Sequence, residues 1–243
     1  MIELPEGLAA ELVPLSWLVG VWEGTGVVEY PIGGPASSGG NGDDEEPEVR
    51  SYEFGQRVSF SHDGLPYLNY SSYTWLLPQA EGESVPEMPR LTADDASEPA
   101  ADAADAASDG PGPEPLAAET GYWRLSRLHI EGDAGPGLLP GSGPRPFNTA
   151  QSVETLRNAA EGFDIEVSIV HPTGVSELYL GQVKGPRIDL STDAVMRTRS
   201  AKEYAAATRI YGLVENHLLW AWDIAALGQD LRTHASARLA KAD

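Results

Sequence analysis

The sequence predicts an all-β protein, with about ten antiparallel strands forming an up-and-down β-barrel and a short helix near the N-terminus. Two observations predict this class. Short segments of alternating apolar and polar residues recur along the chain, and turn residues such as His171-Pro-Thr-Gly174 separate them. Closing such a meander into a barrel removes the edge strands that would otherwise aggregate. We therefore interpret residues 1–243 as one barrel domain.

The elements follow from local pattern. Leucines spaced three or four residues apart predict the helix within Pro5–Leu18. Alternation predicts the strands, and turn signals such as Lys184-Gly-Pro, Glu215-Asn and Leu227-Gly-Gln end them. In chain order, the expected strands are 22–30, 49–60, 65–75, 121–130, 163–170, 175–183, 187–191, 204–214, 217–226 and 231–239.

Three stretches are expected to be disordered insertions: 33–48, 79–118 and 132–146. They are rich in Gly, Ser, Ala, Pro and acidic residues, and they hold too little apolar surface to offset the entropy of ordering. They also explain most of the formal charge of −21, since residues 33–48 carry −5 and residues 79–119 carry −10. The remaining chain is mildly acidic and has no basic stripe, which argues against binding of nucleic acid.

Composition also limits the cellular setting. No apolar run approaches the ~20 residues that cross a bilayer, and the first residues do not resemble a secretory signal. The absence of cysteine excludes disulfides, iron–sulfur clusters and thiolate zinc sites. We expect a cytoplasmic protein with no membrane contact, and we keep a homodimer as an open alternative to a single chain.

His234 is the main candidate functional residue. It lies in the alternating segment Asp230–Leu239, where even-numbered residues share one face and odd-numbered residues share the other. Alternation does not reveal which face is the core. An imidazole on a rigid strand is a candidate ligand for a metal or a haem iron, and the alternative is a surface histidine on an edge strand.

Six motifs occur in order along the chain. They are the GxWxGxG signature of Gly20, Trp22, Gly24 and Gly26, followed by Phe60–Tyr70, Glu119–Tyr122, His171–Gly174, Ala201-Lys202-Glu203 and Asp230–Leu239. Together they resemble the nitrobindin family of haem-binding β-barrels, across essentially the whole chain outside the insertions. The long acidic insertion before the fourth strand and the one after Ile32 depart from that pattern.

This resemblance implies one haem b per chain near one mouth of the barrel. It implies His234 as the axial ligand of the iron and Lys202 as a residue close to the haem. The expected activity is that of a peroxynitrite isomerase, which converts peroxynitrite to nitrate at ferric iron and also binds nitric oxide. No catalytic residue is nominated beyond the haem iron, because the isomerisation requires no general acid or base.

Other residues have competing interpretations. Lys202 could pair with a haem propionate or be an exposed turn lysine, and Arg197 and Arg209 are competing propionate partners. The motif glycines favour close backbone approach within the barrel over contact with a porphyrin, and Trp22 is expected to plug or floor the barrel. Trp220 and Trp222 share one face of their strand and could belong to the core or to a cavity wall.

The remaining histidines are expected to be structural. We expect His62 and His171, both in turns, to bond loop backbone, His217 to begin a strand and His129 to end one. An alternative function is a carrier or sensor of an apolar ligand such as a fatty acid, without catalysis. A carrier of that kind has no use for His234, so this residue discriminates between the two functions.

Overall fold

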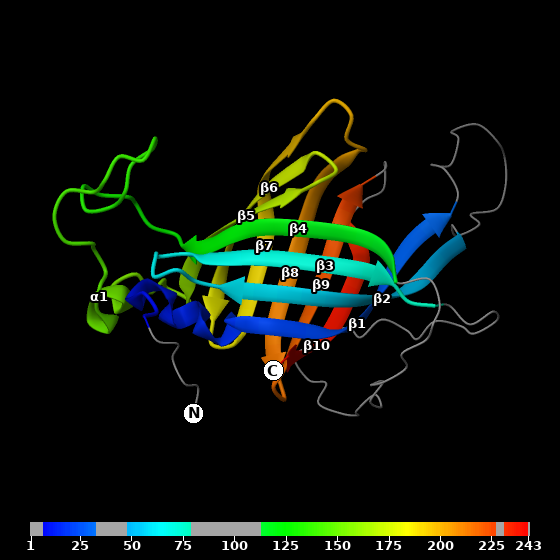
Figure 1. The fold of residues 1–243 in the computed structure, drawn as a ribbon, viewed down its shortest axis with the longest axis horizontal. Coiled ribbons are helices and arrows are strands. Elements are labelled where there is room, and N and C mark those ends of the chain that lie inside the picture. The colour runs from blue at the N-terminus through cyan, green and yellow to red at the C-terminus, as the bar shows by residue number, and fades with distance from the viewer. Residues whose placement is uncertain (1–6, 33–47, 79–112, 227–230, 243) are drawn as a thin grey trace.

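The computed structural model describes residues 7–32, 48–78, 113–226 and 231–242 of the chain. Within them, ten antiparallel strands form one closed barrel in the order β1-β10-β9-β8-β7-β6-β5-β4-β3-β2 (Figure 1). The strands are β1 (Gly20–Ile32), β2 (Glu48–Ser61), β3 (Leu68–Leu76), β4 (Glu114–Leu125), β5 (Phe163–His171), β6 (Val175–Lys184), β7 (Arg187–Arg197), β8 (Tyr204–Val214), β9 (His217–Ala226) and β10 (Arg232–Ala242). The predicted fold class is confirmed.

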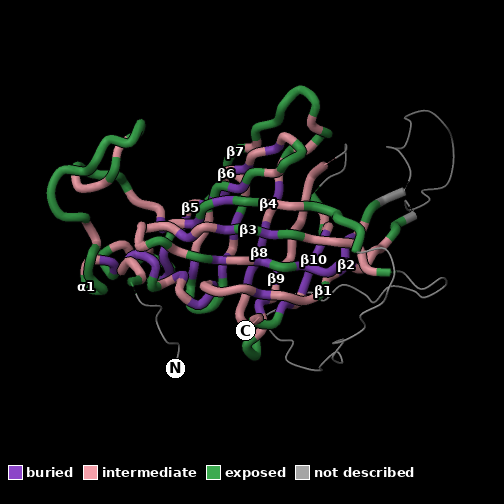
Figure 2. The backbone as a smooth tube through the Cα atoms, viewed as in Figure 1, coloured by how far each residue is buried: buried purple, intermediate pink, exposed green. Residues whose placement is uncertain are grey.

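Burial alternates along the strands, as a barrel with one inner face requires (Figure 2). In β5, for example, Phe163, Ile165, Val167 and Ile169 are buried. Because the strands are antiparallel neighbours in sequence, β8 and β10 begin at the same end of the barrel, where β1 and β3 finish. We call this end the mouth. No helix in the described ranges is long and apolar enough to cross a membrane.

The end opposite the mouth is closed by the N-terminal helix η1 (Ala10–Leu18), a 3₁₀-helix that packs beside the short helix α1 (Ala150–Glu154) (Figure 1). Leu12, Leu15 and Leu18 are fully buried. Their spacing of three matches the three residues per turn of a 3₁₀-helix, so all three side chains lie on one face. Trp22, at the start of β1, is buried against this helix and donates from Nε1 to the carbonyl of Leu18 at 2.7 Å.

A buried ion-pair cluster ties η1 to the loop after β4. The Arg127 guanidinium donates to Glu11 at 2.6 Å and to Asp133 at 2.7 Å, and each of these side chains is less than 10% exposed. The hydrogen bonds from Arg127 lower the pKa of Asp133 to about 2, against the effect of burial. Residues 132–146, expected to be a disordered insertion, form an irregular loop whose first turn is anchored by Asp133.

The largest departure from the predicted elements is β4. It begins at Glu114, inside the expected insertion 79–118, and ends at Leu125, whereas the alternating pattern suggested 121–130. Pairing with β3 explains the early start, because Leu76 and Trp75 pair with Glu114 and Pro115. His129 therefore lies beyond the strand that it was expected to end. Residues 33–47 and 79–112 and the whole Leu227-Gly-Gln turn lie outside the described residues.

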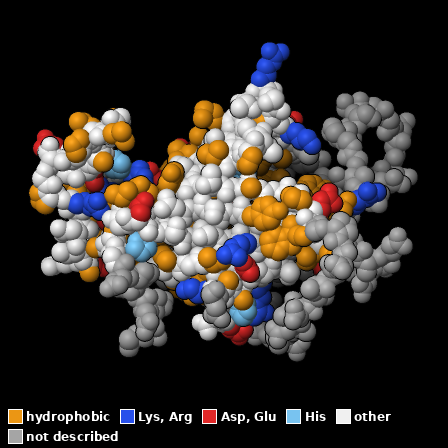
Figure 3. All heavy atoms as spheres, viewed as in Figure 1, with side chains coloured by type: hydrophobic (Ala, Val, Ile, Leu, Met, Phe, Trp, Pro, Cys, Tyr) orange, Lys and Arg blue, Asp and Glu red, His pale blue; other side chains and the backbone are white. Residues whose placement is uncertain are grey.

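On the outer face, an aromatic pair covers a glycine. Tyr73 is 43% exposed and stacks on Trp75 with ring centroids 5.7 Å apart. Apolar side chains gather over this part of the surface in Figure 3. Trp75 pairs with Gly55 across the two strands, and its ring occupies the space that a Cβ at Gly55 would need. An aromatic ring over a strand glycine restores the packing that the glycine lacks.

The seam between β1 and β10 closes the barrel, and it depends on two glycines of the GxWxGxG motif. Gly24 is paired with Leu239 and Gly26 with Ala237. A Cβ on Gly24 would lie 2.2 Å from the Arg238 carbonyl oxygen, and one on Gly26 would lie 2.4 Å from that of Ser236. The strands thus approach more closely than any side chain at these positions would allow.

We expect Gly24→Ala to lower the free energy of unfolding by about 3 kcal/mol, the upper end of overpacking costs, because the clash is with backbone. Gly212→Ala in β8 is the matched control. A Cβ there has only one neighbour, at 3.9 Å, so stability should change little. Urea unfolding of both variants measures the difference. Equal stability of the two variants would contradict the close approach at the seam.

Candidate functional site

A cavity with a volume of about 130 Å³ opens at the mouth of the barrel. Its aromatic walls are Tyr30, Phe54, Tyr70, Tyr211, Trp220 and Trp222, and its polar groups are Gln56, Ser72, Thr74, Glu119, Arg209 and His234. Trp220 and Trp222 both line the cavity, and Trp220 also belongs to the buried core, so the two alternatives left open by their shared face both hold for Trp220. Among the described residues, β5, β6 and β7 contribute no side chain to the lining, so the cavity lies to one side of the barrel.

His234 reaches this cavity through a β-bulge. The register between β10 and β9 pairs Thr233 with Asp223 and then Ala235 with Trp222, so His234 is the extra residue. Strict alternation would place His234 on the face opposite Ala235, Ala237 and Leu239, all of which are buried. The bulge breaks the alternation, so that both His234 and Ala235 line the cavity.

The imidazole of His234 is held on three sides. Its Nδ1 lies 3.1 Å from the carbonyl oxygen of Glu29, at the point where the ladder between β1 and β10 stops. Edge-to-face contacts with Tyr30 and Trp222 place the ring centroids 4.9 Å and 5.4 Å from that of His234. The ring orientation is therefore fixed before any ligand binds.

These contacts also fix the protonation of His234. A carbonyl oxygen can only accept, so Nδ1 carries the hydrogen and Nε2 has the lone pair. Burial, opposed by the bond to Glu29, lowers the pKa of His234 to about 4, so the ring is neutral at pH 7. Neutral imidazole with one nitrogen bonded to a carbonyl and the other free is the form in which histidine binds iron or another metal.

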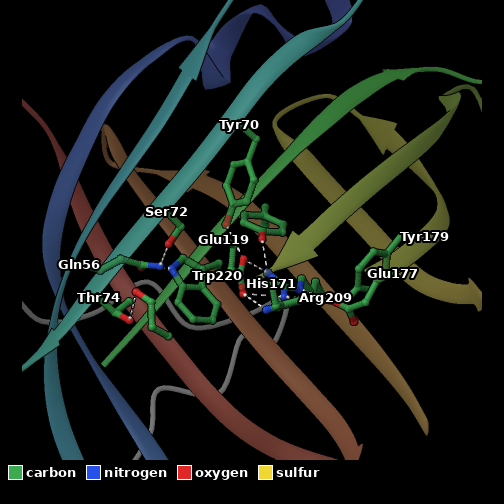
Figure 4. A network of polar contacts seen from close by, with 12 residues as sticks. Gln56, Tyr70, Ser72, Thr74, Glu119, His171, Glu177, Tyr179, Arg209 and Trp220 are labelled. Atoms are coloured by element: carbon green, nitrogen blue, oxygen red, sulfur yellow. Dashed lines mark hydrogen bonds and ion pairs between the residues drawn. The ribbon is translucent and has the colours of Figure 1, made fainter. Parts of the chain in front are cut away.

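A buried ion pair forms another part of the cavity wall. Arg209, 2% exposed, donates two hydrogen bonds of 2.9 Å to the carboxylate of Glu119 (Figure 4). The guanidinium also lies over the Trp222 ring, 4.3 Å from its centroid. Tyr70 donates to the same carboxylate at 2.9 Å. Burial alone would raise the pKa of Glu119, but Arg209 lowers it to about 2, so this carboxylate stays charged.

A second carboxylate, Glu177, extends this network behind the cavity. It accepts from Tyr179 at 2.5 Å, from Tyr204, and from Nε2 of His171 at 2.6 Å. Its nearest contact with Arg209 is 3.6 Å. The expectation that His171 bonds loop backbone was wrong. Its ring lies within the network and stacks nearly parallel to Trp222 at a centroid distance of 6.2 Å.

A third polar feature lies across β9, β2 and β3. Nε1 of Trp220 donates to Oε1 of Gln56 at 2.7 Å, and Nε2 of Gln56 donates to the hydroxyl of Ser72 at 2.9 Å (Figure 4). All three side chains line the cavity and are at most 6% exposed. We call this set the Trp220–Gln56–Ser72 chain.

Of the other candidate residues, Lys202 and His217 lie outside the cavity lining, whereas Arg209 is part of it. Lys202 is exposed, is not part of the lining, and accepts a bond from Arg197 at its main-chain carbonyl. Arg209 lines the cavity but is committed to Glu119, which leaves it poorly suited to bind a propionate. His217 begins β9, as expected, and bonds the carbonyl of Glu215. The described residues contain no cluster of three or more His, Asp or Glu arranged for a metal ion.

The fold and the site together define a class: a closed β-barrel with a cavity at its mouth that is lined by one neutral histidine. The residues present fit a haem. The cavity offers an oriented Nε2 ligand and flat aromatic walls. Residues 11–241 match the model of the THAP4-like, heme-binding beta-barrel domain, and the chain belongs to this family. The family expected from the sequence motifs is thereby confirmed.

Relatives agree with this assignment. The chain is 62% identical to a protein of Leifsonia xyli subsp. xyli and 58% identical to one of Clavibacter michiganensis subsp. michiganensis, both named "Peroxynitrite isomerase". Each alignment covers the full length of both chains. The crystal structure of Rv2717c from M. tuberculosis superposes with a TM-score of 0.55 at 23% identity, covering 99% of this chain and 100% of that one. That likeness supports the fold.

We expect Glu119→Gln to destabilise the protein by about 3 kcal/mol at pH 7, because it leaves the buried Arg209 without its main counter-ion. The pKa of Glu119 is lower in the folded protein, about 2, than its ordinary 4.5. Its contribution is therefore complete above pH 4.5 and is lost as the pH falls toward 2. Urea unfolding at several pH values should show the wild type and the variant converging in acid.

Asp189→Asn is the control for this experiment. Asp189 pairs with Arg187, and the two side chains are 41% and 50% exposed. Solvent weakens such a pair, so its loss should change stability by less than about 1 kcal/mol. A Glu119→Gln protein as stable as Asp189→Asn would contradict the role given to the buried pair.

Proposed function

We propose that the chain binds one haem b through Nε2 of His234 and converts peroxynitrite to nitrate. The observation that carries this proposal is the bulge that turns His234 into the cavity, with Nδ1 bonded to the Glu29 carbonyl and Nε2 free. The names of the two relatives supply the reaction. Peroxynitrite and nitrate contain the same atoms and the same charge, so the reaction consumes no other reactant.

The chain's own residues have limited tasks in this reaction. Ferric haem, when bound, supplies a Lewis-acid centre with a coordination position for peroxynitrite or nitric oxide. His234 anchors that group, and the aromatic walls exclude water from it. The charge of Arg209 is already neutralised by Glu119, so it leaves no free cation in this wall. No side chain needs to donate or remove a proton, because the isomerisation is proton-neutral.

The volume of the cavity indicates where the haem propionates would lie. About 130 Å³ encloses less than a whole porphyrin, so we propose that one edge of the group lies at the mouth. Lys202 lies between the end of β7 and the start of β8, at that same end of the barrel. Its exposed ammonium is our proposed partner for a propionate there.

The proposal also includes nitric oxide binding and a cytoplasmic location. It leaves open whether the protein is a monomer or a homodimer. Nitric oxide requires only the same coordination position as peroxynitrite. The alternative, a carrier of an apolar ligand, gives no purpose to the neutral, oriented imidazole of His234 or to the ion pair in the wall.

We expect a saturable, one-to-one Soret change when wild-type protein is titrated with hemin. His234→Ala should weaken hemin binding by at least about a hundredfold and abolish the increase in nitrate yield from added peroxynitrite. His217→Ala, which changes a half-buried histidine at the start of β9 outside the cavity lining, is the control and should behave as wild type. Wild-type protein that binds a fatty acid but gives no saturable hemin spectrum would favour the carrier.

We expect Lys202→Met to weaken hemin binding by no more than about fivefold, because an exposed ion pair contributes under about 1 kcal/mol. The loss should shrink as salt is added, since exposed charges are screened. Hemin titrations at low and high ionic strength measure both effects. If Lys202→Met binds hemin at low salt as tightly as the wild type, Lys202 is not a propionate partner.

A further inference from the structure

The direction of the Trp220–Gln56–Ser72 chain is fixed at one end. An indole N–H can donate but cannot accept, so the atom of Gln56 that faces Trp220 must be the amide oxygen. The amide nitrogen of Gln56 then faces Ser72, and the Ser72 hydroxyl must accept from it. Each hydrogen bond in the chain therefore points from β9 through β2 to β3.

This direction leaves one hydrogen unused. The Ser72 oxygen accepts from Gln56, so the hydrogen on that oxygen must be directed elsewhere. Among the described residues, no hydrogen bond is donated by the Ser72 hydroxyl, and this side chain is 94% buried on the cavity wall. Thr74, two residues along β3, differs in that its hydroxyl donates to the carbonyl of Ala117 at 3.1 Å.

A buried donor without an acceptor costs free energy, so the acceptor is expected to come from a ligand in the cavity. Trp220 and Trp222 are neighbours on the inner face of β9, and Trp222 touches His234. Trp220, the first member of the Trp220–Gln56–Ser72 chain, is thus the next inward-facing residue of β9 after Trp222, which contacts the proposed iron ligand. Ser72 and His234 line the same cavity, so a small ligand held there by its acceptor atom would use the free hydrogen of Ser72.

We propose that Ser72 is the hydrogen-bond donor that recognises the oxygen end of a small anion bound at the iron, and that Gln56 and Trp220 are positioning residues. This inference rests on the proposed haem function and adds the specificity of the same site. A hydroxyl donor favours acceptors such as peroxynitrite over ligands that lack an acceptor atom. Because the indole of Trp220 can only donate, the hydrogen bonds cannot reverse direction, and Ser72 stays a donor toward the cavity.

The test uses haem-loaded protein with two probes: nitrite bound to the ferric form and carbon monoxide bound to the ferrous form. Ser72→Ala should weaken nitrite binding roughly tenfold, the usual worth of a hydrogen bond to a charged acceptor. It should also raise the C–O stretching frequency, which reports a donor at the bound ligand independently of activity. Ser72→Thr, which keeps the hydroxyl, should restore both values.

Thr74→Val is the matched control, because it removes a hydroxyl from the same strand and wall whose hydrogen is already used. It should leave both readouts near wild type. Trp220→Phe provides a second route that leaves Ser72 intact. Without the indole N–H, the Gln56 amide can turn over and accept from Ser72, so nitrite binding should weaken.

The outcomes separate the two proposals. Nitrite affinity and C–O frequency unchanged in both Ser72→Ala and Trp220→Phe would overturn the role of Ser72 while leaving the haem function intact. Equal losses in Ser72→Ala and Thr74→Val would also overturn it, because they would reflect altered packing. Wild-type protein that takes up no hemin at His234 would overturn the haem function and the inference with it.

Discussion

The pairing of the first strand with the last is the constraint on which the rest of this molecule depends. It closes the barrel, and glycines at Gly24 and Gly26 allow the two backbones to approach where any side chain would collide. The same seam ends at Val28 and Ala235, one residue short of the bulge. The carbonyl of Glu29, released from the ladder, then becomes the acceptor that holds His234. Barrel closure and ligand geometry are thus two results of one strand pair.

The polar interior is the second determinant of the site. Arg209 would be costly to bury alone, and its bonds to Glu119, together with Tyr179 and Glu177, supply the compensation. The network draws on β4, β5, β6 and β8, so it holds the far side of the barrel against the cavity (Figure 4). Burial raises the pKa of Tyr70 and Tyr211, so both hydroxyls stay protonated. Tyr70 donates to Glu119, and Tyr211 accepts from Arg209 at 3.5 Å.

Sequence patterns predicted the fold well, because alternation and turn residues are local signals. They identified ten strands and the N-terminal helix, and they singled out His234, which the structure places in the cavity wall. They did not reveal the bulge at His234, because a bulge depends on the register of two paired strands and leaves no mark on the alternation of one. The early start of β4 was hidden for the same reason, since pairing with β3 outweighs the acidic composition nearby.

The polar groups were harder to predict than the histidine. Glu119 and Arg209 are 90 residues apart in sequence, and His171 joins them through its bond to Glu177 and its ring, which lies 3.8 Å from Glu119. No spacing rule connects such residues, so His171 was taken for a turn residue and Arg209 for one of three competing propionate partners. The Trp220–Gln56–Ser72 chain spans 164 residues at its first bond and was missed entirely. In the sequence, a buried glutamine or serine within a strand stands out because it interrupts the alternation of apolar and polar residues. Its hydrogen-bond partner cannot be read from the sequence.

The acceptor that orients His234 is a main-chain oxygen, and this has an evolutionary consequence. A carboxylate in that place would titrate, and a single substitution could remove it. A peptide carbonyl has no ionisable form in the range where proteins fold, and every residue type at position 29 supplies the same oxygen. The tautomer of the histidine is consequently insulated from acidity and from drift in the neighbouring side chain, and only a change in the course of the backbone can disturb it.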